Sequence, residues 1–231
     1  MKLKTILKYF FSGWAIAFLS ISVIAQEKLF VPTGIRIGTD LSLQGISAFS
    51  SNRSGYEISG DIDFSKYFLV WDIGHESRNR ASPLFNYNSE GDYFRIGLDV
   101  NLLNPHKNKN KNVMFFGFRI AKAFYDDRVT FSIIDNNYGV ITPPFRRNFG
   151  LVANWLEFTA GIKVRLWKNL YLGYTGRLKF SKDLKGDEAI RPFDIPGFGK
   201  SKERSVFGIN YYITYLIRWK DKPLPPEKDR E

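Results

Sequence analysis

The strongest constraint in this chain is a strict alternation of side chains near its C-terminus. From Phe207 to Trp219, every odd position is apolar or aromatic, and the even positions are Gly208, Asn210, Tyr212, Thr214, Leu216 and Arg218. A period of two indicates a β-strand, because successive side chains of a strand point to opposite faces of the sheet. At about 3.3 Å per residue the segment spans roughly 40 Å, which is enough to cross a bilayer when the strand is tilted.

The same alternation recurs in seven earlier segments that are separated by turn-forming residues. The predicted strands cover residues 34–42, 55–64, 67–77, 92–103, 113–125, 154–166, 170–180 and 207–219. The turns between them are short at one end, and the longer connections at the other end cover residues 43–54, 78–91, 126–153 and 181–205. This arrangement is typical of outer-membrane barrels. The sequence therefore predicts an all-β fold, an eight-stranded antiparallel transmembrane β-barrel over residues 34–219, with both termini in the periplasm.

The second face of the predicted strands carries charged residues and glycine. A soluble barrel would turn its apolar face inward, but the interior of eight strands is too narrow for this many aromatic side chains. We therefore expect the apolar face to contact lipid and the charged face to fill the lumen, without an open pore. Buried charges need partners, and the acids lie mostly on early strands and the bases mostly on later ones. The predicted lumen ion-pair network comprises Arg36, Glu57, Asp61, Asp63, Asp72, Glu76, Arg95, Asp99, Arg119, Glu157, Lys163, Arg165, Arg177, Lys179 and Arg218.

The regions that flank the predicted barrel differ from it in composition. Residues 1–25 have a basic start and an apolar stretch ending in Val23-Ile24-Ala25, which is typical of a cleaved signal peptide. An N-terminal transmembrane anchor is the alternative interpretation. We expect residues 26–33 to form a periplasmic stretch and residues 220–231 a charged, proline-rich periplasmic tail. Aromatic side chains expected at the two membrane interfaces are Tyr67, Trp155, Trp167 and Trp219.

Few residues suggest catalysis. The chain has no cysteine, which excludes disulfides and thiolate metal sites. Of its two histidines, His106 lies in a charge-rich turn, and His75 lies near the outer end of a strand without an assignable serine. The run from Gly197 to Ser201 resembles only the end of a phosphate-binding loop. We therefore expect no catalytic, cofactor or metal site.

The formal net charge of +11 does not predict nucleic-acid binding. Its basic residues are dispersed along the strands instead of forming a patch. Solvated loop charge is the simpler interpretation of the basic residues in the long connections. The residues that are candidates to contact lipopolysaccharide phosphates are Arg146, Arg147, Lys182, Lys185, Lys200 and Lys202. The expected partners are outer-membrane lipids and lipopolysaccharide.

Several blocks resemble an uncharacterised family of Bacteroidota outer-membrane proteins, the DUF6048 type. These blocks are residues 91–99, 154–158, 168–173, 195–198 and 207–217. The resemblance implies an outer-membrane location and a barrel fold, and it transfers no catalytic residues. Some small barrels of these bacteria are accessory subunits of larger machines such as the barrel-assembly machinery. This analogy favours a non-catalytic structural or partner-binding subunit of an outer-membrane complex. A rim-located enzyme that modifies lipid or lipopolysaccharide, with His75, and a narrow solute channel are the alternatives.

Overall fold

The computed structural model describes residues 31–83, 85–104, 111–131, 133–135, 139–141, 146–181 and 192–220. The predicted signal peptide, most of the stretch 26–33 and the tail beyond residue 220 lie outside this part of the chain, as do His106, Lys182 and Lys185. Among the described residues, no helix combines the length and the apolar character needed to cross a membrane.

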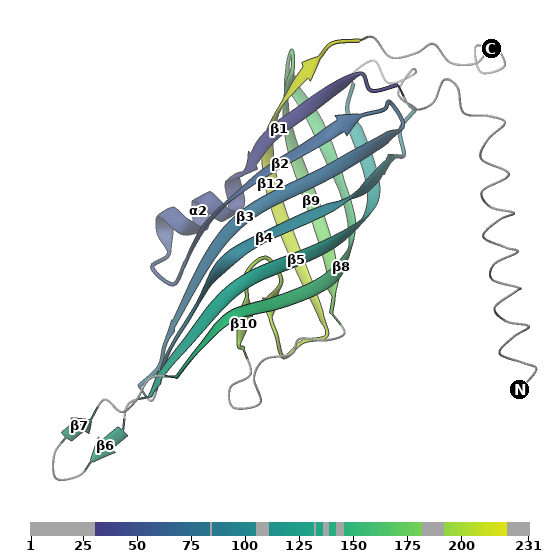
Figure 1. The fold of residues 1–231 in the computed structure, drawn as a ribbon. Helices are drawn as coiled ribbons and strands as arrows, with labels where there is room; N and C mark the ends of the chain where they lie inside the picture. The colour runs from purple at the N-terminus through teal and green to yellow at the C-terminus, as the bar shows by residue number, and fades with distance from the viewer. Residues whose placement is uncertain are drawn as a thin grey trace, which may run out of the picture. The chain divides into compact units, whose positions relative to one another are not determined.

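Eight strands form one closed antiparallel barrel (Figure 1). They are β1 (Gly34–Asp40), β2 (Arg53–Asp63), β3 (Tyr67–Ala81), β4 (Phe85–Asn101), β5 (Val113–Phe131), β8 (Arg146–Trp167), β9 (Leu170–Phe180) and β12 (Ser205–Arg218). The barrel closes where β1 pairs with β12, with Gly34 opposite Arg218. We call the end with this pair the terminal end, and the opposite end the loop end. The predicted eight-stranded antiparallel barrel is confirmed.

A helix and two small hairpins lie in the connections at the loop end. They are α2 (Leu41–Phe49), the hairpin of β6 (Ile133–Asp135) with β7 (Gly139–Ile141), and the hairpin of β10 (Asp194–Ile195) with β11 (Gly199–Lys200). The helix was not predicted from the sequence. Asp40 is its N-cap, because the carboxylate accepts a hydrogen bond from the Ser42 backbone N–H at 2.8 Å.

Four strands continue further than the sequence predicted. Residues 78–91 and 126–153 were expected to be loops, whereas β3, β4, β5 and β8 extend through most of them. In β3 and β4 the outward side chains become polar here, as at Asn79 opposite Asn88, so the alternation is lost although the backbone stays extended. The expectation of loops was wrong because the strands extend beyond the region in which apolar and polar side chains alternate.

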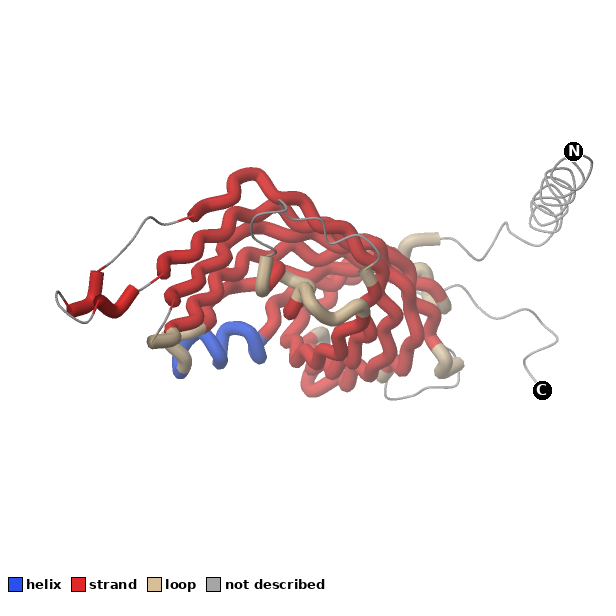
Figure 2. The backbone as a smooth tube through the Cα atoms, turned by 90° about the horizontal axis from the view of Figure 1, so that it is seen from below, coloured by secondary structure: helices blue, strands red, loops and turns tan. Residues whose placement is uncertain are grey.

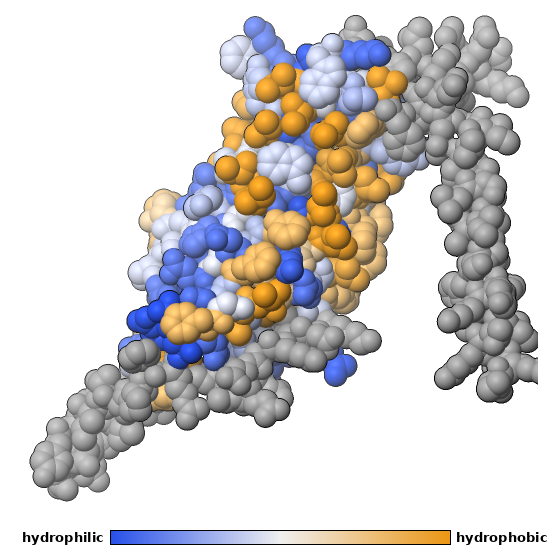
Figure 3. All heavy atoms as spheres, in the orientation of Figure 1, coloured by the Kyte–Doolittle hydropathy of each residue, from blue (hydrophilic) through white to orange (hydrophobic). Residues whose placement is uncertain are grey.

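Apolar side chains cover the outside of the barrel wall, and Figure 3 shows them gathered over one broad part of it. One row of exposed side chains passes in register across five neighbouring strands: Leu98, Phe118, Phe158, Leu178 and Phe207. Nearer the loop end polar pairs enter the outward face, with Lys122 opposite Asn154 and His75 opposite Asp92, although Phe124 opposite Val152 is still apolar and exposed. The barrel therefore carries an apolar outer belt that ends before the strands do.

Candidate functional site

A layer of charged side chains occupies the middle of the lumen. We call this set the central layer, and its members, all buried, are Glu57, Asp72, Arg95, Asp99, Arg119, Glu157 and Arg177. Alternation along the strands turns each of them inward. Asp72 contacts three guanidinium groups, with distances of 2.5 Å to Arg119, 3.2 Å to Arg177 and 3.8 Å to Arg95. This carboxylate joins strands from opposite sides of the barrel.

Arg95 and Arg177 link the two glutamates of the central layer, Glu57 and Glu157. Arg95 lies 2.6 Å from Glu57 and 3.0 Å from Glu157. Arg177 lies 2.8 Å from Glu157 and donates a hydrogen bond to the Tyr212 hydroxyl at 2.6 Å. Tyr212 in turn donates to Glu57 at 2.5 Å. Because each charge has at least one opposite charge beside it, the layer avoids the large cost of an isolated buried ion.

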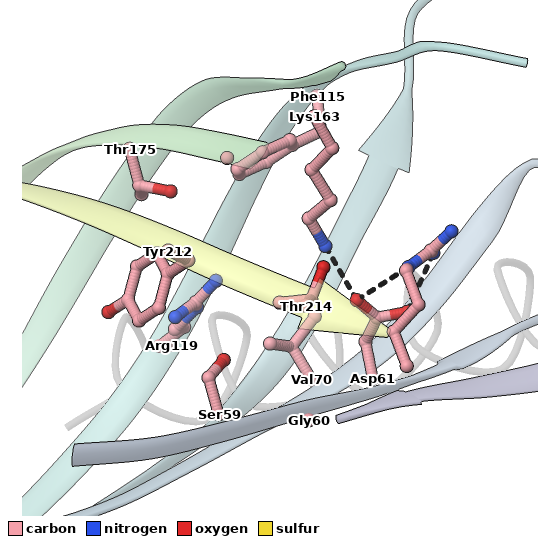
Figure 4. A pocket seen from close by; sticks show the side chains of 12 residues that line it. Ser59, Gly60, Asp61, Val70, Phe115, Arg119, Lys163, Thr175, Tyr212 and Thr214 are labelled. Carbon is pink, nitrogen blue, oxygen red and sulfur yellow. Dashed lines mark hydrogen bonds and ion pairs between the residues drawn. The ribbon is translucent and has the colours of Figure 1, made fainter. Parts of the chain in front are cut away.

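A second layer lies nearer the terminal end, and we call it the terminal layer. Asp61 accepts from Arg36 at 3.0 Å and from Lys163 at 2.6 Å, and Figure 4 shows Lys163 reaching toward Asp61 across the lumen. Arg36 also lies 3.5 Å from Asp63. The guanidinium of Arg36 stacks over the Phe68 ring at 4.5 Å, which is a cation–π contact.

A small cavity separates the terminal and central layers (Figure 4). Its volume is about 20 Å³, and its lining includes Lys163, Arg119, Tyr212 and Thr214. This space accommodates about one water molecule. The cavity thus leaves room for hydration of the ion pairs and not for a solute.

A third group of charges lies at the loop end, where a segment of the chain enters the barrel and contacts them. We call residues 192–201 the plug loop. Glu76 contacts Arg53 at 2.7 Å and Arg78 at 2.5 Å, and it accepts a hydrogen bond from the Gly197 backbone N–H at 3.0 Å. Arg78 also pairs with Asp194 of the plug loop at 2.9 Å. Glu76 therefore connects the barrel wall to the plug loop.

The plug loop also binds to lumen cations through its backbone. The Gly197 carbonyl accepts from Lys179 at 2.7 Å and from Arg95 at 3.1 Å. Gly197 has a φ of +75°, and a Cβ atom there would lie 2.6 Å from the Tyr93 ring. Glycine is therefore required both for the left-handed backbone and for the close approach to the wall.

Apolar side chains complete the contact of the plug loop with the barrel. Ile195 and Phe198 are buried in a cluster with Tyr93, Tyr125 and Trp155. Figure 2, which views this end of the barrel, shows the loop around β10 and β11 inside the curve of the strands. The loop end of the lumen is thus covered by a folded loop and not by side chains of the wall alone.

The structure corrects the expected position of Trp155. Its side chain is 3% exposed and stacks edge-on against Phe198 with ring centroids 5.7 Å apart, inside the barrel. It shares the inward parity of Glu157, to which its indole N–H donates at 2.7 Å. Of the other expected interface aromatics, Trp167 and Trp219 are exposed and Tyr67 is half-buried, all at the terminal end.

Not every predicted lumen charge joins the network. Arg165 and Arg218 are half-buried at the terminal end and form no ion pair with any residue that the structure describes. Lys179 binds the backbone carbonyls of the plug loop instead of a carboxylate. Conversely, Arg53, Arg78 and Asp194 were missed, because the sequence placed them in loops; Arg78 keeps the inward parity of Glu76, which was the signal available. Twelve of the fifteen predicted charges form ion pairs in the lumen: Arg36, Glu57, Asp61, Asp63, Asp72, Glu76, Arg95, Asp99, Arg119, Glu157, Lys163 and Arg177.

His75 lies on the outer face of the wall. Its Nδ1 is 2.8 Å from the Asp92 carboxylate and its Nε2 is 3.5 Å from Glu90, and its ring stacks on Tyr56. Within the described residues, no hydroxyl group is hydrogen-bonded to His75, and no cluster of three metal-ligating side chains occurs. The loop-end basic residue Arg147 pairs with Asp126 at 3.1 Å.

We expect Glu76→Gln to release the plug loop from the barrel. The variant removes the negative charge that holds Arg53, Arg78 and the Gly197 N–H together. Amide hydrogen exchange at Gly197 should become at least tenfold faster, while exchange in the middle of β4 stays unchanged. Glu90→Gln is the matched control, because Glu90 lies on the outer face. Equal exchange in the two variants would show that Glu76 does not hold the loop.

The model of the family described as a domain of unknown function (DUF6048) matches residues 6–222. No curated protein matches the sequence. Among solved structures, the N-terminal β-barrel domain of OprF from Pseudomonas aeruginosa is similar at 8% identity and a TM-score of 0.39, over 80% of this chain and 98% of that one. Neisserial surface protein A (NspA) is similar at 10% identity and a TM-score of 0.31, over 81% of this chain and 96% of that one. Similarities of this size transfer no function.

Proposed function

This chain belongs to the DUF6048 family, a domain of unknown function, and we propose that it is a non-catalytic outer-membrane barrel that does not conduct. We propose further that it acts as a structural or partner-binding accessory subunit of an outer-membrane complex. One observation carries this proposal: the barrel is apolar outside and filled with paired charges inside. A barrel built in this way interacts through its outer wall and its ends, because the cavity between the charged layers of the described lumen holds about one water molecule.

The outer belt supports a location in a membrane. Soluble proteins rarely expose a contiguous apolar patch larger than a few hundred Å². Here the exposed row from Leu98 to Phe207 passes across five strands, and further apolar rows lie above and below it. A wall that is apolar outside and polar inside is the pattern of outer-membrane barrels.

The orientation follows the usual arrangement of such barrels, with short turns and both termini in the periplasm. The described ends of the chain lie together at the terminal end, where the Trp219 N–H donates to the Thr33 carbonyl at 3.2 Å. The loop end, with the plug loop and α2, then faces the outside of the cell. Exposed Trp167 and Trp219 lie at the periplasmic interface in this orientation.

We expect Phe158→Arg to lower the free energy of unfolding from lipid vesicles by about 2–4 kcal/mol, because the side chain would enter the hydrocarbon region. Asn154→Arg is the matched control: it lies on the same strand and face, opposite Lys122, at a position that is already polar. Its expected cost is about 0–1 kcal/mol. Equal costs in urea titrations of the two refolded variants would contradict a lipid-facing belt.

The accessory role requires a stable protein partner. Purification of the full chain from outer membranes in mild detergent should recover that partner at a constant ratio. Recovery of the barrel as a lone species would overturn the accessory role and would leave the membrane location standing.

A further inference from the structure

The barrel wall is incomplete at its loop end between β12 and β2. Strand β1, which lies between them, ends at Asp40 opposite Tyr212. Beyond this point β12 continues to Ser205, and β2 begins at Arg53. The segments 53–57 and 205–211 are therefore not joined by a strand, and we call the space between them the notch. Figure 1 shows α2 where β1 ends.

Side chains contact three backbone groups on the β2 side of the notch: the Gly55 N–H, the Gly55 C=O and the Glu57 C=O. The Ser47 hydroxyl of α2 lies 2.9 Å from the Gly55 carbonyl oxygen and accepts from the Gly55 N–H at 2.8 Å. The Thr39 hydroxyl donates to the Glu57 carbonyl at 2.8 Å. The helix thus covers the edge of β2 at Gly55.

On the β12 side of the notch, the Tyr211 N–H donates to the Asp40 carboxylate at 3.4 Å, and the edge is open beyond it, at Phe207 and Ile209. The Leu216 N–H donates toward the β9 side, to Asn169, and the Trp219 N–H donates toward the β1 side, to Thr33. In an antiparallel sheet this alternation continues along the strand, so the N–H and C=O groups of Phe207 and Ile209 face the notch. No residue that the structure describes hydrogen-bonds to these groups.

Side-chain exposure agrees with an opening at this place. The inward-facing residues Gly208 and Asn210 are half-buried, whereas Thr175 and Arg177 on the neighbouring strand are fully buried. On the outer side, Phe207 and Ile209 are exposed, and Phe49 at the end of α2 is 94% exposed. The notch is therefore an open strand edge with apolar side chains around it.

The chemistry of this edge selects its occupant. Acyl chains offer no hydrogen-bonding groups, so lipid cannot satisfy the free backbone N–H and C=O groups, and leaving them unpaired in hydrocarbon is costly. An extended peptide satisfies them as a sheet partner. A second copy of this chain would bring its own Lys202 and Arg204 against the same residues, and like charges opposite each other are unfavourable.

We propose that the open edge of β12 at Phe207–Ile209 binds an extended, apolar-faced segment of a different protein by strand addition. Acidic residues of that segment would lie beside Lys202 and Arg204, and Phe49 would contact its apolar face. This inference rests on the proposed accessory function and names the surface that performs it.

Residue-resolved hydrogen exchange tests the edge itself. In the isolated barrel, the amides of Phe207 and Ile209 should exchange at least tenfold faster than those of Gly208 and Asn210, which pair with β9. In the complex purified from outer membranes, the first two amides should become protected. Protection of Phe207 and Ile209 already in the isolated barrel would overturn the proposal.

Two substitutions distinguish the contribution of the Ile209 backbone N–H to partner binding from that of the Ile209 side chain. Ile209→Pro removes the N–H that faces the notch and keeps the ladder with β9, so partner recovery should fall at least tenfold. Ile209→Ala keeps the N–H and should retain most of the partner. Both variants must first show the compact mobility of a folded barrel in unheated gels; if the proline variant does not fold, the protection of Phe207 in the wild-type complex decides.

The experiments distinguish failure of the strand-addition proposal from failure of the proposed accessory function. A partner that binds Ile209→Pro as well as wild type overturns the strand-addition edge and leaves the accessory function standing. Recovery of a second copy of this chain at the edge overturns the choice of a different protein. Recovery of no partner by the wild-type chain overturns both the accessory function and this inference.

Discussion

Replacing Asp72 by asparagine is expected to lower the free energy of unfolding by about 3–5 kcal/mol, because the change leaves buried charges without their partner. Asp72 is fully buried, and three arginines converge on it from different strands. Asparagine keeps the size of the side chain and removes the negative charge, so packing is preserved while the guanidinium groups repel one another. Urea titration of the barrel in lipid vesicles, followed by tryptophan fluorescence, measures the loss.

Asp126→Asn is the control for this experiment. Asp126 pairs with Arg147 at 3.1 Å, but the side chains are 38% and 34% exposed. Exposed ion pairs contribute about 0–1 kcal/mol because water and salt screen them. If the two variants lose the same stability, the central layer is solvated and the lumen is not closed by ion pairs.

A second substitution tests whether the charges act as a network. Arg119→Met combined with Asp72→Asn removes one cation together with the anion that it contacts at 2.5 Å. The double variant should lose less than the sum of the two single losses, because fewer unpaired charges remain.

The strands were predictable because a closed barrel with an apolar outer face and a charged inner face imposes a period of two on the sequence. The same parity predicted which charges face inward, and Glu57, Asp72 and Arg177 lie together as expected. Parity does not give the partner of each charge, since that depends on which strands meet across the lumen. Arg165 and Arg218 have the correct parity, but the carboxylate in register with Arg218 across Gly34, Asp63, lies beside Arg36.

The remaining errors have two physical causes. Trp155 was assigned to the interface from the preference of tryptophan for that region, although its parity with Glu157 turned it inward. The helix α2 and the plug loop depend on contacts distant in sequence, such as the hydrogen bond from Gly197 to Glu76. No local sequence pattern indicates that a glycine-containing loop folds into the barrel.

Phe198→Ala is expected to lower the free energy of unfolding by about 3–5 kcal/mol, because a large buried ring is removed. Phe198 is buried between Trp155 and the other members of the apolar cluster, so the variant leaves a cavity under the plug loop. Phe193→Ala is the control in the same loop: its half-buried ring lies over Arg80, and its loss should cost less.

Phe198→Ala also distinguishes two ways of closing the lumen, by the plug loop or by the central layer. The central layer lies beneath the plug loop, and Arg95 contacts both, donating to the Gly197 carbonyl at 3.1 Å and pairing with Glu57 at 2.6 Å. Loosening the loop therefore exposes the central layer without removing it, and planar bilayers that contain Phe198→Ala should show no stable channel. A wide, steady conductance in this variant, absent from Phe193→Ala, would mean that the plug loop alone closes the barrel and that the paired charges beneath it admit ions.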